Sequence, residues 1–169
     1  SKTLKVIKNN LEKEIDSNWD KAKSYNETQF DENLELNDVY KGFTPANNQT
    51  DNSINGEVRF VDAIKKGIDE SMSKYDNLVI MGQDIAEYGG VFKVTEGLIE
   101  KYGKERVLNT PLCESAILST AYGLSVGGYK SIVEMQFADF ISSGFTAIVN
   151  LIAKSNYRWS QNSDIVVRM

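Results

Sequence analysis

The chain has 169 residues, of which 41% are hydrophobic, and a formal net charge of −5. This length allows one ordinary domain with its own core plus an appendage, and the acidic balance argues against binding of duplex nucleic acid, where a basic face is expected. The single cysteine excludes an internal disulfide and fits a reducing compartment, so we expect a cytoplasmic protein, and the absence of histidine excludes Ser-His-Asp, Cys-His and histidine–metal chemistry within the chain.

The first 43 residues differ in pattern from the rest. Apolar residues recur there at steps of three and four, which predicts one amphipathic helix with a narrow apolar stripe: Leu4, Ile7, Leu11, Ile15, Trp19 and Ala22. Residues 44–56 are rich in Asn, Thr, Ser and Gly, and we expect a flexible linker there. The basic start lacks a continuous apolar core, so it is no secretory signal, and no run of about 18 apolar residues suggests a membrane span.

From Glu57 onward, helical and strand-like segments alternate. We expect helices at 60–72, 94–102, 114–126 and 140–159, and strands at 78–81, 106–108, 131–137 and 164–169. Strands separated by helices of this length predict an α/β fold with a mainly parallel sheet and helices on both faces. No turn or helix follows the last expected strand, so we expect the chain to be a piece of a longer polypeptide, incomplete at its C-terminus.

Glu114 stands at the beginning of a helix built almost wholly from small and apolar residues, which we expect to be buried. Pro111 disfavours helix at the residue before it, so the helix begins just after Leu112 and Glu114 lies in its first turn. Free backbone N–H groups stabilise a negative charge there, and acids are common at this position as capping residues. The competing interpretation is functional: apolar surroundings favour the neutral carboxyl and the helix dipole favours the charged one, a balance that suits proton transfer.

Two further loops follow expected strands, and ligands gather at the carboxyl ends of parallel strands. The glycines of residues 82–92 do not form the dinucleotide-binding pattern, so an ordinary strand-to-helix loop is the simpler interpretation there. Gln136 with Phe137 and Phe140 is suited to hydrogen-bond and stack a flat heterocycle, although core packing explains the two aromatics equally well. Cys113, without a histidine, is interpreted as a small buried residue rather than a nucleophile. We therefore expect three loops to converge at one edge of the sheet.

The order and spacing of several motifs resemble one family, the beta subunits of the thiamine-diphosphate-dependent decarboxylase component of 2-oxo acid dehydrogenase complexes. The motifs are Gly82-Gln83-Asp84, Gly89 to Phe92, Thr95 to Leu98, Lys101 to Val107, Asn109 to Glu114 and Gln136 to Asp139. The resemblance is strongest to the branched-chain (2-oxoisovalerate) type and covers about residues 57–169. Residues 1–43, with Asp38-Val39-Tyr40 near their end, resemble the C-terminal tail of the matching alpha subunit, which implies a polypeptide in which alpha and beta parts are fused.

The resemblance also implies roles for individual residues. Glu114 matches the family's catalytic glutamate, which hydrogen-bonds a ring nitrogen of the cofactor's aminopyrimidine and promotes the tautomer that activates the cofactor. Phe140 matches the aromatic that packs on the pyrimidine ring, and Leu112 and Gln136 match further positions of the pocket. Gln83 also belongs to this cofactor-binding set and stands where the family usually has an acid.

By the same resemblance, the chain is the pyrimidine-binding, transketolase-like domain of an enzyme that decarboxylates a 2-oxo acid of the 3-methyl-2-oxobutanoate type. The acyl group then passes to the lipoyl domain of an acyltransferase component. The family holds the diphosphate and Mg²⁺ with an alpha-type domain, through a GDG…N motif that this chain lacks. We therefore expect no metal site here and no activity of the fragment alone. We also expect a homo-oligomeric assembly. Two alternatives stay open: a pyruvate substrate, or a non-catalytic domain that buries its small-residue helix against a partner subunit.

Overall fold

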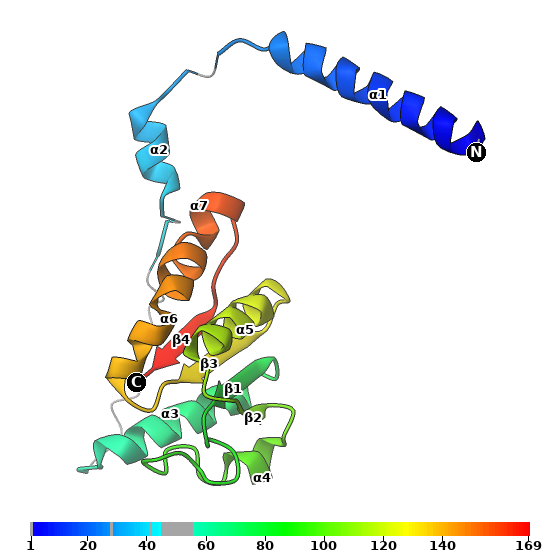
Figure 1. Cartoon of the computed structure of the whole chain (residues 1–169). Helices are drawn as coiled ribbons and strands as arrows, with labels where there is room; N and C mark the ends of the chain where they lie inside the picture. The colour runs from blue at the N-terminus through cyan, green and yellow to red at the C-terminus, as the bar shows by residue number, and fades with distance from the viewer. Residues whose placement is uncertain (1, 28, 41, 45–55) are drawn as a thin grey trace. The chain divides into compact units, whose positions relative to one another are not determined.

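The computed structural model describes residues 2–27, 29–40, 42–44 and 56–169, which form two compact units, 1–36 and 37–169 (Figure 1). The expected linker at 44–56 falls almost entirely outside the described residues. None of the helices in the described ranges is long and apolar enough to cross a membrane.

The first unit consists mainly of helix α1 (Lys2–Lys23), which confirms the amphipathic helix predicted from its spacing. Its apolar stripe is exposed: Leu11 is 53% and Trp19 is 64% accessible. Helix α2 (Glu32–Asp38) follows and begins with a side-chain cap, because the Asp31 carboxylate accepts hydrogen bonds from the backbone N–H groups of Asn33 and Leu34 at 3.0 and 3.1 Å.

The second unit is built on a sheet of four strands, which are all parallel, as predicted, and stand in the order β2-β1-β3-β4. The strands are β1 (Leu78–Gly82), β2 (Val107–Asn109), β3 (Lys130–Glu134) and β4 (Ile165–Arg168). All five residues of β1 are buried, because this strand has a neighbour on either side and helices over both faces.

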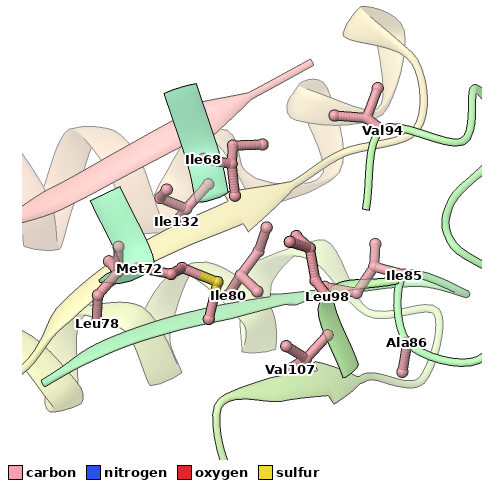
Figure 2. Packing of buried hydrophobic residues seen from close by; sticks show 10 residues of the cluster. All are labelled: Ile68, Met72, Leu78, Ile80, Ile85, Ala86, Val94, Leu98, Val107 and Ile132. Carbon is pink, nitrogen blue, oxygen red and sulfur yellow. The ribbon is translucent and has the colours of Figure 1, made fainter. Parts of the chain in front are cut away.

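The alternation of side chains along β1 divides the core into two layers. Leu78 and Ile80 pack on one face with residues from helix α3 (Phe60–Lys74) and helix α4 (Leu98–Tyr102), as Figure 2 shows. Val79 and Met81 pack on the other face with residues from helix α5 (Glu114–Val126). The predicted α/β architecture with helices on both faces is therefore confirmed.

Two predicted boundaries are displaced. The helix expected at 94–102 begins only at Leu98, because Thr95 is fully buried and its hydroxyl donates to the Ile85 carbonyl at 2.7 Å, which fixes the preceding residues in a turn. The strand expected to continue to Phe137 ends at Glu134, where the pairing with β4 ends at Arg168.

The single long helix expected at 140–159 is wrong. The chain forms instead a short 3₁₀ turn, helix α6, a π turn and helix α7, at Ala138–Phe140, Ile141–Ala147, Ile148–Ile152 and Ser155–Trp159. The Ala153 N–H donates to the Ile148 carbonyl, five residues back, at 2.8 Å. The Ser155 hydroxyl donates a hydrogen bond to the Ile152 carbonyl at 2.9 Å, so a side chain competes with the backbone hydrogen bonds of the helix at this point.

Helix α5 is also less buried than its composition suggested. Ile117, Leu118, Ala121 and Ser125 are buried, whereas the opposite face is exposed at Ala116, Ser119, Thr120, Gly123 and Val126. Both faces of α5 carry small and apolar residues, but only one face packs against the sheet, so only that face is buried.

Candidate functional site

The carboxyl ends of the strands are aligned at one edge of the sheet. Gly82 pairs with Asn109 on one side and with Glu134 on the other, and Glu134 pairs with Arg168. The three loops expected to carry function leave the sheet from this edge. Their convergence there is as predicted from the order of strands and helices.

Close backbone approach and hydrogen bonds join these loops. A Cβ at Gly82 would lie 2.9 Å from the Glu134 carbonyl oxygen, so only glycine fits between β1 and β3. The Thr110 N–H donates to the Gly82 carbonyl at 2.9 Å, and the Asn109 side-chain oxygen accepts from the Ala86 N–H at 2.8 Å. The Thr110 hydroxyl is buried and has no partner in the described part of the chain.

Glu114 is the first residue of α5 and is half-buried. Cys113 occupies the N-cap position and makes no side-chain capping bond. Within the described residues the Glu114 carboxylate has neither a hydrogen bond nor an ion pair, so it does not act as a hydrogen-bonded cap. The carboxylate therefore lies at the positive end of the α5 helix dipole, and its oxygens accept no hydrogen bond from the described residues.

Gly144 brings α6 against the first turn of α5. A Cβ at Gly144 would lie 2.4 Å from Leu118 Cδ1 and 3.5 Å from the Glu114 carbonyl oxygen. The Ser115 hydroxyl donates to the Ser143 carbonyl at 2.6 Å and fixes the same contact. Phe140 immediately precedes α6, and α6 packs against α5, the helix that begins with Glu114.

Three phenylalanine rings form a chain at this edge. Phe137 contacts Phe140 with ring centroids 5.7 Å apart at 87°, and it contacts Phe92 at 6.3 Å and 79°. The rings are 49%, 38% and 55% exposed for Phe137, Phe140 and Phe92, so core packing does not explain them. Sequence reasoning did not single out Phe92 as a site residue; the signal was its place two residues after the Gly89-Gly90 pair in a loop that follows a strand.

A buried ion pair lies beneath the same loops and was not predicted. Arg168 Nη1 is 2.6 Å from Glu134 Oε2, and the Glu134 side chain is 2% exposed. Burial raises the pKa of the Glu134 carboxyl, and the Arg168 charge opposes that rise. A Cβ at Gly90 would lie 3.5 Å from Glu134 Oε1, so the loop after β1 covers this carboxylate. The available signal was an acid closing one apolar strand and an arginine closing another.

The remaining predicted residues lie in the loops at the same edge. Gln83 and Gln136 are half-buried in the loops after β1 and β3, and Leu112 is 70% exposed in the loop after β2. Cys113 is exposed, so its interpretation as a buried residue was wrong: the N-cap of α5 lies at the rim of the sheet and not in its core.

Relatives of the second unit are the beta subunits of 2-oxo acid dehydrogenases. The chain is 43% identical over 113 residues to the 2-oxoisovalerate dehydrogenase subunit beta of Bacillus subtilis, covering 64% of this chain and 34% of the relative. It is 49% identical over 96 residues to a mitochondrial 2-oxoisovalerate dehydrogenase subunit beta of Dictyostelium discoideum, covering 57% and 26%. It is 43% identical over 101 residues to a pyruvate dehydrogenase subunit beta of Acholeplasma laidlawii, covering 60% and 31%.

The chain thus spans about a third or less of the length of these relatives. One protein family also matches most of the second unit, which amounts to more than half of the whole chain. Residues 57–162 match the transketolase pyrimidine binding domain, and the chain belongs to that family.

Proposed function

We propose that this chain supplies the pyrimidine half of a thiamine diphosphate site in a 2-oxo acid dehydrogenase of the branched-chain, 3-methyl-2-oxobutanoate type. The observation that carries the proposal is the half-buried Glu114 carboxylate at the start of α5, which has no hydrogen-bond partner within the described residues. The names of the relatives from Bacillus subtilis and Dictyostelium discoideum support the branched-chain assignment.

The chemistry of the residues at the edge fits an aminopyrimidine ring. Such a ring presents nitrogen atoms that share a proton with a carboxylate and a flat face that stacks on an aromatic side chain. Glu114 supplies the carboxylate, Phe140 supplies a partly exposed ring, and Thr110 adds a buried hydroxyl with no partner in the described chain. Leu112, Gln83 and Gln136 are the further lining residues in this proposal.

In the proposed mechanism, Glu114 holds a proton at the ring nitrogen and Phe140 fixes the plane of the ring. The N-terminus of α5 places free backbone N–H groups beside the Glu114 carboxylate. Thiamine diphosphate, when bound, supplies the carbon nucleophile that attacks the 2-oxo carbon and releases CO₂.

The diphosphate and its Mg²⁺ belong, in this proposal, to an alpha-type domain outside the chain. Residues 1–43 are the C-terminal tail of that alpha part, residues 44–56 are a linker, and residues 57–169 are the pyrimidine-binding domain. The acyl group passes to a lipoyl-bearing acyltransferase, and the assembly is a homo-oligomer. Isothermal titration calorimetry should therefore detect no micromolar binding of thiamine diphosphate to the isolated chain, and such binding would contradict this division of the site.

Substitution of Glu114 in the assembled enzyme tests the proposal. Glu114→Gln should abolish decarboxylation of 3-methyl-2-oxobutanoate while size-exclusion chromatography shows unchanged assembly. The matched control is Glu100→Gln, which neutralises an exposed acid of α4 and should leave the rate unchanged. Activity that survives Glu114→Gln would favour instead an assembly domain that uses the exposed small-residue face of α5.

Pyruvate is the second candidate substrate, supported by the name of the Acholeplasma laidlawii relative. Steady-state rates with the two 2-oxo acids distinguish the candidates. A higher kcat/KM for pyruvate than for 3-methyl-2-oxobutanoate would replace the branched-chain assignment and leave the proposed roles of Glu114 and Phe140 intact.

A further inference from the structure

The contacting rings of Phe92, Phe137 and Phe140 link two loops that are distant in sequence. Phe92 comes from the loop after β1, whereas Phe137 and Phe140 come from the loop after β3. Both contacts are edge-to-face, at 79° and 87°, which is the geometry favoured by the quadrupoles of two aromatic rings. The position of each ring therefore constrains the orientation of the next.

The backbone around Phe92 is held by buried neighbouring residues and by hydrogen bonds. Val94 and Thr95, two and three residues later, are 2% and 0% exposed. The Gly90 N–H donates to the Asp84 carbonyl at 2.9 Å, and the Lys93 N–H donates to the Gly90 carbonyl at 3.1 Å, which closes a turn around Phe92. These contacts set the position from which the Phe92 ring projects.

The Phe137 side is fixed by the end of the sheet. Met135 is 2% exposed, and its N–H donates to the Arg168 carbonyl at 2.8 Å, directly beside the Glu134–Arg168 ion pair. The Phe140 N–H then donates to the Phe137 carbonyl at 3.1 Å. Phe137 thus stands between a fixed strand end and the ring of Phe140.

We propose that Phe92 and Phe137 are positioning residues, which set the orientation of the Phe140 ring and so the face that it offers to a bound heterocycle. This inference rests on the proposed function for the identity of the heterocycle, an aminopyrimidine. Phe92 acts only through Phe137, because no contact joins the rings of Phe92 and Phe140 within the described residues.

Fluorine NMR of the full chain with 4-fluorophenylalanine at position 140 tests the ring orientation directly. Phe92→Leu keeps an apolar side chain but removes the ring, and should shift the fluorine resonance; Phe92→Tyr should restore the wild-type position. In a Phe137→Leu background, Phe92→Leu should cause no further shift. Tyr88→Leu is the matched control, because Tyr88 is an exposed aromatic of the same loop that contacts Lys93 and none of the three rings, and it should leave the resonance unchanged.

Calorimetry with thiamine diphosphate on the protein assembled with its diphosphate-binding partner gives the second readout. One lost edge-to-face contact should weaken binding by about 3- to 10-fold in Phe92→Leu, with Tyr88→Leu unchanged. An unshifted resonance in Phe92→Leu, a shift that persists in the Phe137→Leu background, or wild-type affinity in Phe92→Leu would overturn the inference. If the wild-type assembly does not bind thiamine diphosphate, the proposed function fails and with it the aminopyrimidine, while the resonance still decides whether the rings are coupled.

Discussion

Gly144→Ala is the sharpest test of how α5 and α6 are packed behind the candidate site. The added Cβ would lie 2.4 Å from Leu118 Cδ1, well inside contact distance, and 3.5 Å from the carbonyl oxygen of Glu114. Leu118 is fully buried, so its side chain has no free space into which it can turn. The two helices must separate, or Leu118 must adopt a strained rotamer.

The size of the effect follows from two opposing terms. Overpacking of a dense core costs about 1–3 kcal/mol, and replacement of a helical glycine by alanine returns about 1 kcal/mol. The net loss should therefore be at most about 2 kcal/mol, or up to about 8 °C in the unfolding temperature of a domain this size. Circular dichroism during thermal and urea unfolding measures both quantities.

Gly123→Ala is the matched control, since Gly123 lies on the exposed face of α5 with nothing within 4 Å of the added Cβ. It should raise stability by about 0.5–1 kcal/mol. Leu118→Ala provides the reversal: alone it should cost about 3–5 kcal/mol, and in its background Gly144→Ala should become neutral or stabilising because the added methyl group fills the cavity. Equal stabilities of the Gly144→Ala and Gly123→Ala variants, or additive effects of Gly144→Ala and Leu118→Ala, would refute the packing argument.

Three further predictions concern charges and backbone conformation. Burial raises the pKa of the Glu134 carboxyl above 4.5, so the contribution of Glu134 to stability falls as the pH rises from about 4.5 through the raised value. Urea unfolding across this range should show the stability of wild type falling relative to that of Glu134→Gln. A constant difference between the two proteins would contradict this prediction. Hydrogen bonds from Lys101, and to a smaller extent from Tyr102, lower the pKa of the Asp69 carboxyl below 3.8. Wild type should therefore be more stable than Asp69→Asn at neutral pH, and this difference in stability should vanish on acidification through the lowered value. A difference that persists in acid would contradict this prediction. Gly90→Ala forces alanine to φ +76 with Thr95 Oγ1 at 3.2 Å and should cost about 1–2 kcal/mol in thermal unfolding, whereas Gly67→Ala, inside helix α3 with open space around it, should raise stability by about 0.5–1 kcal/mol.

Local patterns in the sequence predicted most of the elements and the edge of the sheet at which the candidate site was expected. The apolar run closed by Gly82 predicted a buried strand, and β1 is buried along its whole length. The alternation of strands and helices predicted a parallel sheet, and a parallel sheet necessarily brings the loops after its strands to one edge. Glu114 could be chosen because an acid at the start of an apolar helix is a local signal.

The sequence alone did not give the contacts between segments distant in the chain. The spacing of 140–159 fits one helix, but the side chain of Ser155 bonds to the Ile152 carbonyl and interrupts it. Glu134 and Arg168 become a pair only because β3 and β4 are neighbours in register, and Phe92 reaches Phe137 only because the loops after β1 and β3 meet. Periodicity within about ten residues predicted the strands, the parallel sheet and all the helices of the second unit except the last, because these elements depend on local pattern. The partners of each side chain at the site depended on strand order and register, which only long-range packing decides.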